Sequence, residues 1–121
     1  MAVSYLKRDS SPQQTVFSQE DWSSAYCNVE KELNQAELKL VKGSIPKQIS
    51  GTFYRNGPGR LERNGKWVHH PFDGDGMITS IKFENGQPFL TNRFVKTKGY
   101  LEEEKINKFI YRGVFGTQKN G

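Results

Sequence analysis

The sequence predicts an all-β fold, and three observations support this prediction. Residues 77–84 alternate between apolar and polar side chains, as a half-buried strand does. The pairs Asn64-Gly65 and Asn85-Gly86 are typical of tight hairpin turns. Residues 51–55 are rich in residues that favour strands. Short strands joined by hairpins indicate a β-sandwich, a barrel or a propeller.

The chain before residue 51 is expected to be mostly irregular. Residues 1–20 are polar and predict a flexible lead-in, so we expect the domain to span residues 21–121. Residues 37–42 partly alternate and favour a short strand, which the glycine and proline that follow would end. After the strand at residues 51–55, the segment Asn56-Gly57-Pro58-Gly59 predicts a turn, because glycine and proline interrupt strands.

Two further elements are expected before the main hairpin. Residues 66–69 favour a strand after the Asn64-Gly65 turn. The segment Asp73-Gly74-Asp75-Gly76 predicts another turn. In that turn the glycines would supply positive φ angles, and the aspartates would accept backbone N–H groups.

The hairpin of residues 77–95 is the clearest element. Asn85-Gly86 predicts its turn, and residues 88–95 predict its second strand. Residues 100–108 favour a helical turn or a loop, and residues 109–114 favour one more strand. On the first strand of the hairpin, the more apolar face is expected to meet the core; it carries Met77, Thr79, Ile81 and Phe83.

The composition limits the function classes. The net charge of +5 is compatible with a solvated basic surface, an anionic partner or a membrane surface. The single cysteine, Cys27, cannot form an internal disulfide and fits a reducing compartment. The sequence shows no signal-peptide pattern near its start and no apolar run near the ~20 residues of a membrane helix. We therefore expect a cytoplasmic protein whose contact with a membrane, if it has one, is peripheral.

Few residues are suited to catalysis or to metal binding. His69 and His70 are the only histidines, and neighbours on a strand point to opposite faces, so they cannot readily chelate one metal. The Asp73-Gly74-Asp75 segment resembles the start of a calcium loop, but Met77 and Ile78 occupy positions that need an oxygen ligand and a glycine. Neither face of residues 89–96 is both aromatic and basic throughout its length, so we expect no nucleic-acid partner.

Two glycine-rich motifs carry a family resemblance. They are Gly-Thr-Phe-Tyr-Arg-Asn-Gly-Pro-Gly at residues 51–59 and His-Pro-Phe-Asp-Gly-Asp-Gly-Met at residues 70–77. With residues 43–46, 93–95 and 111–116 in the same order, they resemble the N-terminal signature of the carotenoid oxygenases, non-haem iron enzymes that cleave polyenes. The resemblance implies a seven-bladed β-propeller. This chain would supply about one blade and strands of its neighbour, after an irregular N-terminal segment.

The resemblance also implies an activity for the full-length family. Four histidines near the propeller axis hold Fe(II), and oxygen splits one double bond of an apolar polyene into two carbonyl products. All four histidines lie C-terminal to the part matched here. We therefore expect no catalytic residue, no metal ligand and no bound iron in this chain alone, and we expect the chain to be inactive by itself. The alternative is a small basic β interaction module that binds an anionic partner.

The resemblance implies a substrate-binding role for one residue of this chain. Phe72 matches a position that lines the apolar substrate tunnel, whereas His70 matches a signature histidine that is not an iron ligand. Asp73 and Asp75 are carried over as structural turn residues. The residues assigned to the structural motif are Arg55, Asn56, Gly57, Pro58, Gly59, His70, Asp73, Gly74, Asp75 and Gly76.

Overall fold

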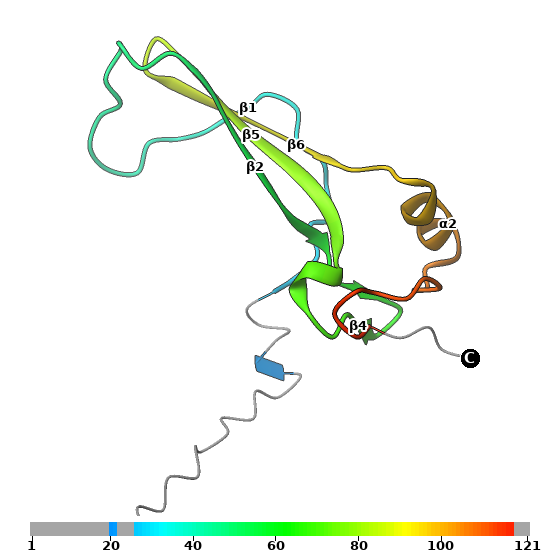
Figure 1. Cartoon of the computed structure of the whole chain (residues 1–121). Helices are drawn as coiled ribbons and strands as arrows, with labels where there is room; N and C mark the ends of the chain where they lie inside the picture. The colour runs from blue at the N-terminus through cyan, green and yellow to red at the C-terminus, as the bar shows by residue number, and fades with distance from the viewer. Residues whose placement is uncertain (1–19, 22–25, 118–121) are drawn as a thin grey trace, which may run out of the picture.

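The described part of the chain is built on a four-stranded antiparallel sheet with the strand order β1-β6-β5-β2. The computed structural model describes residues 20–21 and 26–117, so the predicted lead-in of residues 1–20 lies, except for Glu20, outside the described residues. The long strands form an elongated, twisted ribbon, and α2 and β4 lie toward one end of it (Figure 1). The elements are β1 (Ala36–Glu37), β2 (Gly51–Arg60), β3 (Glu62–Arg63), β4 (Lys66–Trp67), the 3₁₀ helix η1 (Pro71–Asp73), β5 (Asp75–Glu84), β6 (Gln87–Phe94) and α2 (Lys98–Ile106).

Both predicted hairpin turns are confirmed. Asn85 and Gly86 join β5 to β6 with φ angles of 51° and 80°, and Asn64 and Gly65 join β3 to β4 with φ angles of 51° and 78°. Two consecutive positive φ angles produce a turn whose twist matches that of the flanking strands. The predicted core face of β5 is confirmed as well, since Met77 is 4% exposed and the other three residues of that face are half-buried.

The helix α2 closes a small core at one end of the sheet. The Thr97 side chain caps it by accepting the N–H of Tyr100, and Asn107 ends it in the left-handed conformation. The ring of Tyr100 stacks on Phe94 with centroids 5.2 Å apart, and Met77 completes the buried cluster. Residues 100–108, for which a helical turn or a loop was predicted, therefore contribute most of a capped helix.

The predicted turn at residues 56–59 is wrong. The strand β2 continues through this motif to Arg60 and pairs with β5, with an irregularity between Pro58 and Arg60. Proline is tolerated here because β2 is an edge strand of the sheet. Glycine is required at position 59, since a Cβ there would lie 2.8 Å from the Cβ of Met77 and 2.8 Å from a ring carbon of Phe94.

The predicted turn at residues 73–76 is also wrong. Asp73 ends η1, and Asp75 and Gly76 already belong to β5. Gly74 has a φ of −69°, and Gly76 is not among the glycines with positive φ. Glycine is needed at position 74 for space instead, because a Cβ would lie 2.9 Å from the carbonyl oxygen of Arg60.

Three predicted strands are shorter than expected or absent. Of residues 37–42, only Glu37 is in a strand. The N–H of Leu38 still donates to the Pro88 carbonyl, but the chain then leaves the sheet, and Val41 is 99% exposed. The strand predicted at residues 66–69 ends at Trp67. Residues 109–114 form no strand. The Glu103 carboxylate instead accepts the N–H groups of Ile110 and Tyr111 in that segment.

Candidate functional site

The two glycine-rich motifs meet at one groove. Antiparallel pairing of β2 with β5 places Asn56 opposite Ile78 and Pro58 opposite Gly76. The groove beside this pairing has a volume of about 450 Å³. Most of the predicted motif residues therefore converge in space although they come from separate segments. The groove is lined by Arg55, Asn56, Gly57, Pro58, Pro71, Phe72, Gly74 and Gly76.

Phe72 presents an apolar ring at this groove. Its side chain lies on η1 and is 74% exposed. His70 caps η1, since its Nδ1 accepts the N–H of Phe72 at 3.1 Å. The ring of Phe115 stacks on His70 at 4.7 Å and meets Phe72 edge-on at 5.6 Å. Phe72 is therefore exposed to the groove and contacts the rings of His70 and Phe115. The contact with Phe115 was not predicted from the sequence.

The carboxylate of Asp73 holds the loop of residues 113–117. Its Oδ1 accepts the N–H of Phe115 at 2.9 Å, and its Oδ2 accepts the N–H of Thr117 at 3.0 Å. The Thr117 hydroxyl in turn accepts the N–H of His69 at 2.8 Å. Gly113 leaves room for the carboxylate, since a Cβ there would lie 2.6 Å from Oδ1 and closer still to Cγ and Oδ2. Asp73 thus accepts backbone N–H groups as predicted, but from a segment about 40 residues away rather than from its own turn.

The hydrogen bonds to Asp73 make the contact with this loop sensitive to pH. Burial acts to raise the pKa of Asp73, but hydrogen bonds from Phe115 and Thr117 outweigh it, so the pKa lies below its usual value. The stabilisation of the loop by Asp73 is therefore complete above the ordinary aspartate pKa of about 4 and is lost as the pH falls through the lowered value.

We expect the amide signals of Phe115 and Thr117 to shift together at acidic pH in NMR spectra of the ¹⁵N-labelled chain. The Asp73→Asn variant should lose this transition, whereas Glu84→Gln, the same chemical change at an exposed carboxylate, should keep it.

Asp75, the other aspartate of the motif at residues 70–77, has a different partner. It accepts a hydrogen bond from Nη2 of Arg63 at 2.7 Å, and Nη1 of the same guanidinium donates to Glu104 at 2.5 Å. The Arg63 side chain is 1% exposed, and its guanidinium lies 5.5 Å from the ring centres of Tyr100 and Phe109. This buried group joins β3, β5 and α2. We call the ionic part of it the Arg63 cluster, which consists of Arg63, Asp75, Glu103 and Glu104.

Burial and charge act in opposite directions on the Arg63 cluster. Burial acts to lower the pKa of Arg63, but hydrogen bonds to Glu104 and Asp75 reverse this and raise it, so the arginine stays charged. Burial also raises the pKa of Asp75, although Arg63 acts in the opposite direction. A charged arginine in this place is stabilised only while its carboxylate partners remain.

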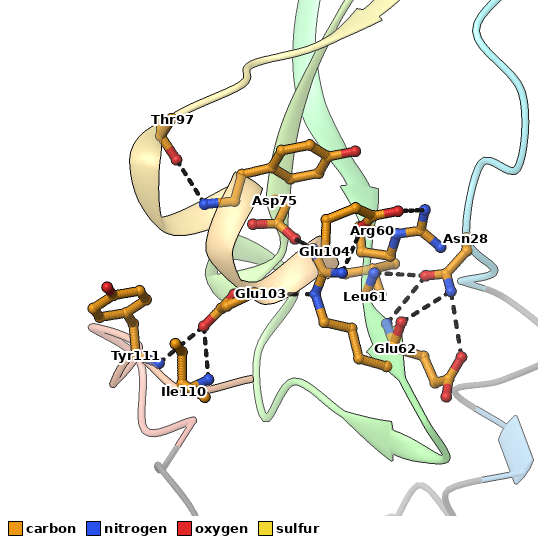
Figure 2. Close-up of polar contacts among 12 residues, drawn as sticks. Asn28, Arg60, Leu61, Glu62, Asp75, Thr97, Glu103, Glu104, Ile110 and Tyr111 are labelled. Carbon is orange, nitrogen blue, oxygen red and sulfur yellow. Dashed lines mark hydrogen bonds and ion pairs between the residues drawn. The ribbon is translucent and has the colours of Figure 1, made fainter. Parts of the chain in front are cut away.

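The glutamates of α2 also contact β2 and the irregular segment that follows the helix (Figure 2). One oxygen of Glu103 accepts the backbone N–H groups of Ile110 and Tyr111 at 2.8 and 2.9 Å. Glu104 pairs with Arg60 at 3.2 Å. Nearby, the Asn28 side chain accepts the N–H groups of Leu61 and Glu62 and donates to the Glu62 carbonyl. Glu103 thus satisfies two backbone N–H groups, those of Ile110 and Tyr111, in the segment where a strand was predicted.

The described residues do not fit the iron site that the resemblance implies. Within residues 20–21 and 26–117, no three His, Cys, Asp or Glu side chains gather so that they could hold a metal ion. The two histidines are adjacent, and His70 is engaged with Phe72 and Phe115. In the same part of the chain, no helix has the length and apolar character needed to cross a membrane.

Comparison with known proteins gives consistent matches. The sequence profile of the retinal pigment epithelial membrane protein (RPE65) family matches residues 26–120. The apocarotenoid-15,15′-oxygenase of Synechocystis is 48% identical over 113 residues, which are 93% of this chain and 23% of that protein. The probable carotenoid cleavage dioxygenase 4 of Arabidopsis thaliana is 33% identical over 93 residues, which are 77% of this chain and 16% of that protein.

The solved structures agree with the sequence matches. Cobalt-substituted apocarotenoid oxygenase from Synechocystis superposes with a TM-score of 0.76 at 48% identity, over 86% of this chain and 22% of that one. A chimera of that oxygenase with RPE65 superposes with the same TM-score, identity and coverage. The chain therefore spans less than a quarter of the length of the relatives it matches.

Proposed function

Because the chain belongs to the RPE65 family of carotenoid oxygenases, we propose that it is the N-terminal part of an Fe(II)-dependent dioxygenase. The complete enzyme would cleave one double bond of a carotenoid or apocarotenoid to carbonyl products. The observation that carries this proposal is the 48% identity to the Synechocystis apocarotenoid-15,15′-oxygenase, which extends over 93% of this chain. The match favours this function over a small basic interaction module, which is supported only by the net charge of +5.

The proposal gives the sheet a place in a larger fold. Residues 21–121 would be the N-terminal portion of a seven-bladed propeller domain, and the sheet of β1, β6, β5 and β2 would be one of its blades. Large apolar side chains that are exposed on β2, such as Phe53 and Tyr54, fit packing against further blades.

The residues of this chain would bind and orient the substrate rather than carry out the cleavage. Phe72, exposed at the groove between the two motifs, would contact the apolar polyene. We assign no catalytic residue and no metal ligand to this chain, because its two adjacent histidines do not form a four-histidine site. The Fe(II) of the complete enzyme would be held by residues outside the part described here.

The remaining expectations belong to the same proposal. An enzyme with an apolar polyene substrate would contact a membrane peripherally while working in the cytoplasm. The expectation that it binds no nucleic acid stays a prediction.

A graft tests the proposal. Residues 26–117 would replace the matched segment of the Synechocystis enzyme, and we refer to the product as the graft chimera. A chimera of the Synechocystis enzyme with RPE65 has been crystallised, which supports the use of a chimera here. We expect the graft chimera to bind iron and to cleave apocarotenoids with a kcat/KM within about tenfold of the parent, a change of ~1.4 kcal/mol. A folded, iron-loaded graft chimera that cleaves no apocarotenoid or carotenoid would contradict the proposal.

Phe72 can be tested in the same background. Burying a phenylalanine ring stabilises a complex by ~1.5–3 kcal/mol, so Phe72→Ala should raise the KM by about tenfold or more while the kcat changes little. Phe72→Leu keeps an apolar side chain and should recover most of the affinity. An unchanged KM in Phe72→Ala would show that this ring does not touch the substrate.

A further inference from the structure

The ring of Phe115 has no regular secondary structure to hold it. Residues 108–117 form an irregular segment, and Gly116 within it has a φ of 104°. The place of Phe115 therefore depends on the contacts of this loop with the rest of the chain. The loop closes on itself through the N–H of Gly113, which donates to the Thr117 carbonyl at 2.8 Å.

Asp73, which belongs to the motif at residues 70–77, attaches this loop to that motif. Its two oxygens accept the N–H groups of Phe115 and Thr117, so one carboxylate orients the backbone on both sides of Gly116. Hydrogen bonds to a charged acceptor are about twice as strong as neutral ones. The close approach of Gly113 leaves the carboxylate little room to move.

The backbone of Phe115 is thus fixed while its ring packs behind Phe72. The ring stacks on His70 at an interplanar angle of 24°, and His70 meets Phe72 edge-on with centroids 4.9 Å apart. Phe72 itself lines the groove, whereas His70 and Phe115 do not. A displaced loop would remove both the stack on His70 and the edge contact with Phe72.

We infer that Asp73 is a positioning residue for polyene binding, which acts by holding Phe115 and His70 behind Phe72. This inference rests on the proposed function. It assigns the two motif aspartates to separate roles, because Asp75 is engaged by Arg63 in the buried cluster and Asp73 holds the loop. Asp73 shapes the wall of the groove without lining it.

The first test compares Asp73→Asn with Glu84→Gln in the graft chimera. An amide at position 73 can accept only one of the two N–H groups well, so we expect the crystal structure to show Phe115 displaced from His70. The loss of one charge-assisted hydrogen bond should raise the KM by about tenfold, with unchanged kcat and iron content. Glu84→Gln makes the same chemical change at an exposed carboxylate and should alter neither the structure at Phe115 nor the KM.

A double-mutant cycle gives an independent readout. Gly113→Ala should raise the KM on its own, because its Cβ would overlap the Asp73 carboxylate. In an Asp73→Ala background the carboxylate is gone, so adding Gly113→Ala should cost much less. Such non-additivity is expected for residues that are in direct contact, whereas distant, independent sites give additive effects.

Three results would overturn the inference. One is Phe115 still stacked on His70 in Asp73→Asn with an unchanged KM. Another is a loss of kcat and iron content in that variant with an unchanged KM, which would indicate a general structural role. The third is full additivity of the cycle. The unsubstituted graft chimera separates the two proposals, because its failure to cleave would contradict the proposed function, whereas the crystal structure of Asp73→Asn still decides whether Asp73 holds the rings.

Discussion

Arg63→Met is expected to lower the free energy of unfolding of the chain by about 3–5 kcal/mol, since it leaves the largely buried Asp75 carboxylate without its guanidinium partner. Arg63 is 2% exposed and faces Asp75, Glu103 and Glu104. Without the guanidinium these three carboxylates would repel one another where α2 meets the sheet. Such a loss is a large part of the 5–15 kcal/mol that stabilises a typical domain.

Two further variants show whether the effect of Arg63 comes from its charge and geometry. Arg63→Lys keeps the charge but cannot reach Asp75 and Glu104 with two nitrogens at once, so it should be intermediate. Lys82→Met removes an exposed cation that pairs with Glu84, and it should cost at most about 1 kcal/mol. Urea denaturation followed by tryptophan fluorescence measures all three. An Arg63→Met variant as stable as Lys82→Met would contradict a structural role for the cluster.

Local signals in the sequence were sufficient for the main hairpin. The alternation over residues 77–84 depends only on the period of a strand, and the Asn-Gly pairs determine the turn conformation by themselves. The core face of β5 followed from the same pattern. These features are local, so no knowledge of distant segments was needed.

The glycine-rich motifs were misjudged because their glycines have tertiary roles. Glycine and proline in residues 56–59 suggested a turn. Gly59 instead leaves room for the side chains of Met77 and Phe94, and Pro58 is tolerated because β2 is an edge strand. In the second motif, both aspartates serve partners outside their own segment. The turn propensity of glycine and proline reflects only the local backbone, so it does not account for contacts with residues from distant segments of the chain.

The long-range polar contacts could not have been predicted from one sequence. Asp73 meets Phe115 and Thr117 more than 40 residues later, and Arg63 meets Glu104 at a separation of 41 residues. Three consecutive glutamates indicate a solvated helix face, yet Glu103 is buried and accepts the N–H groups of Ile110 and Tyr111, which follow the helix. The resemblance, by contrast, drew attention to two motifs whose residues line one groove, and the role of Phe72 there stays a prediction.

The iron site is the central point on which this account can fail. The complete enzyme is proposed to hold Fe(II) with four histidines, and this chain contains only His69 and His70, which are adjacent. Four imidazoles must converge from separate strands to form such a site. The chain by itself should therefore lack both the metal and the activity, whereas the graft chimera should have both.

The most direct measurement is iron retention and polyene cleavage by the purified chain of 121 residues. The chain and the graft chimera would each be loaded with Fe(II) without oxygen, freed of excess metal, analysed for iron and then assayed for apocarotenoid cleavage under oxygen. We predict that the chain retains no stoichiometric iron and forms no carbonyl product, while the graft chimera retains iron and cleaves the substrate. Stoichiometric iron with catalytic turnover in the chain alone would contradict the account, because it would require ligands other than a four-histidine set.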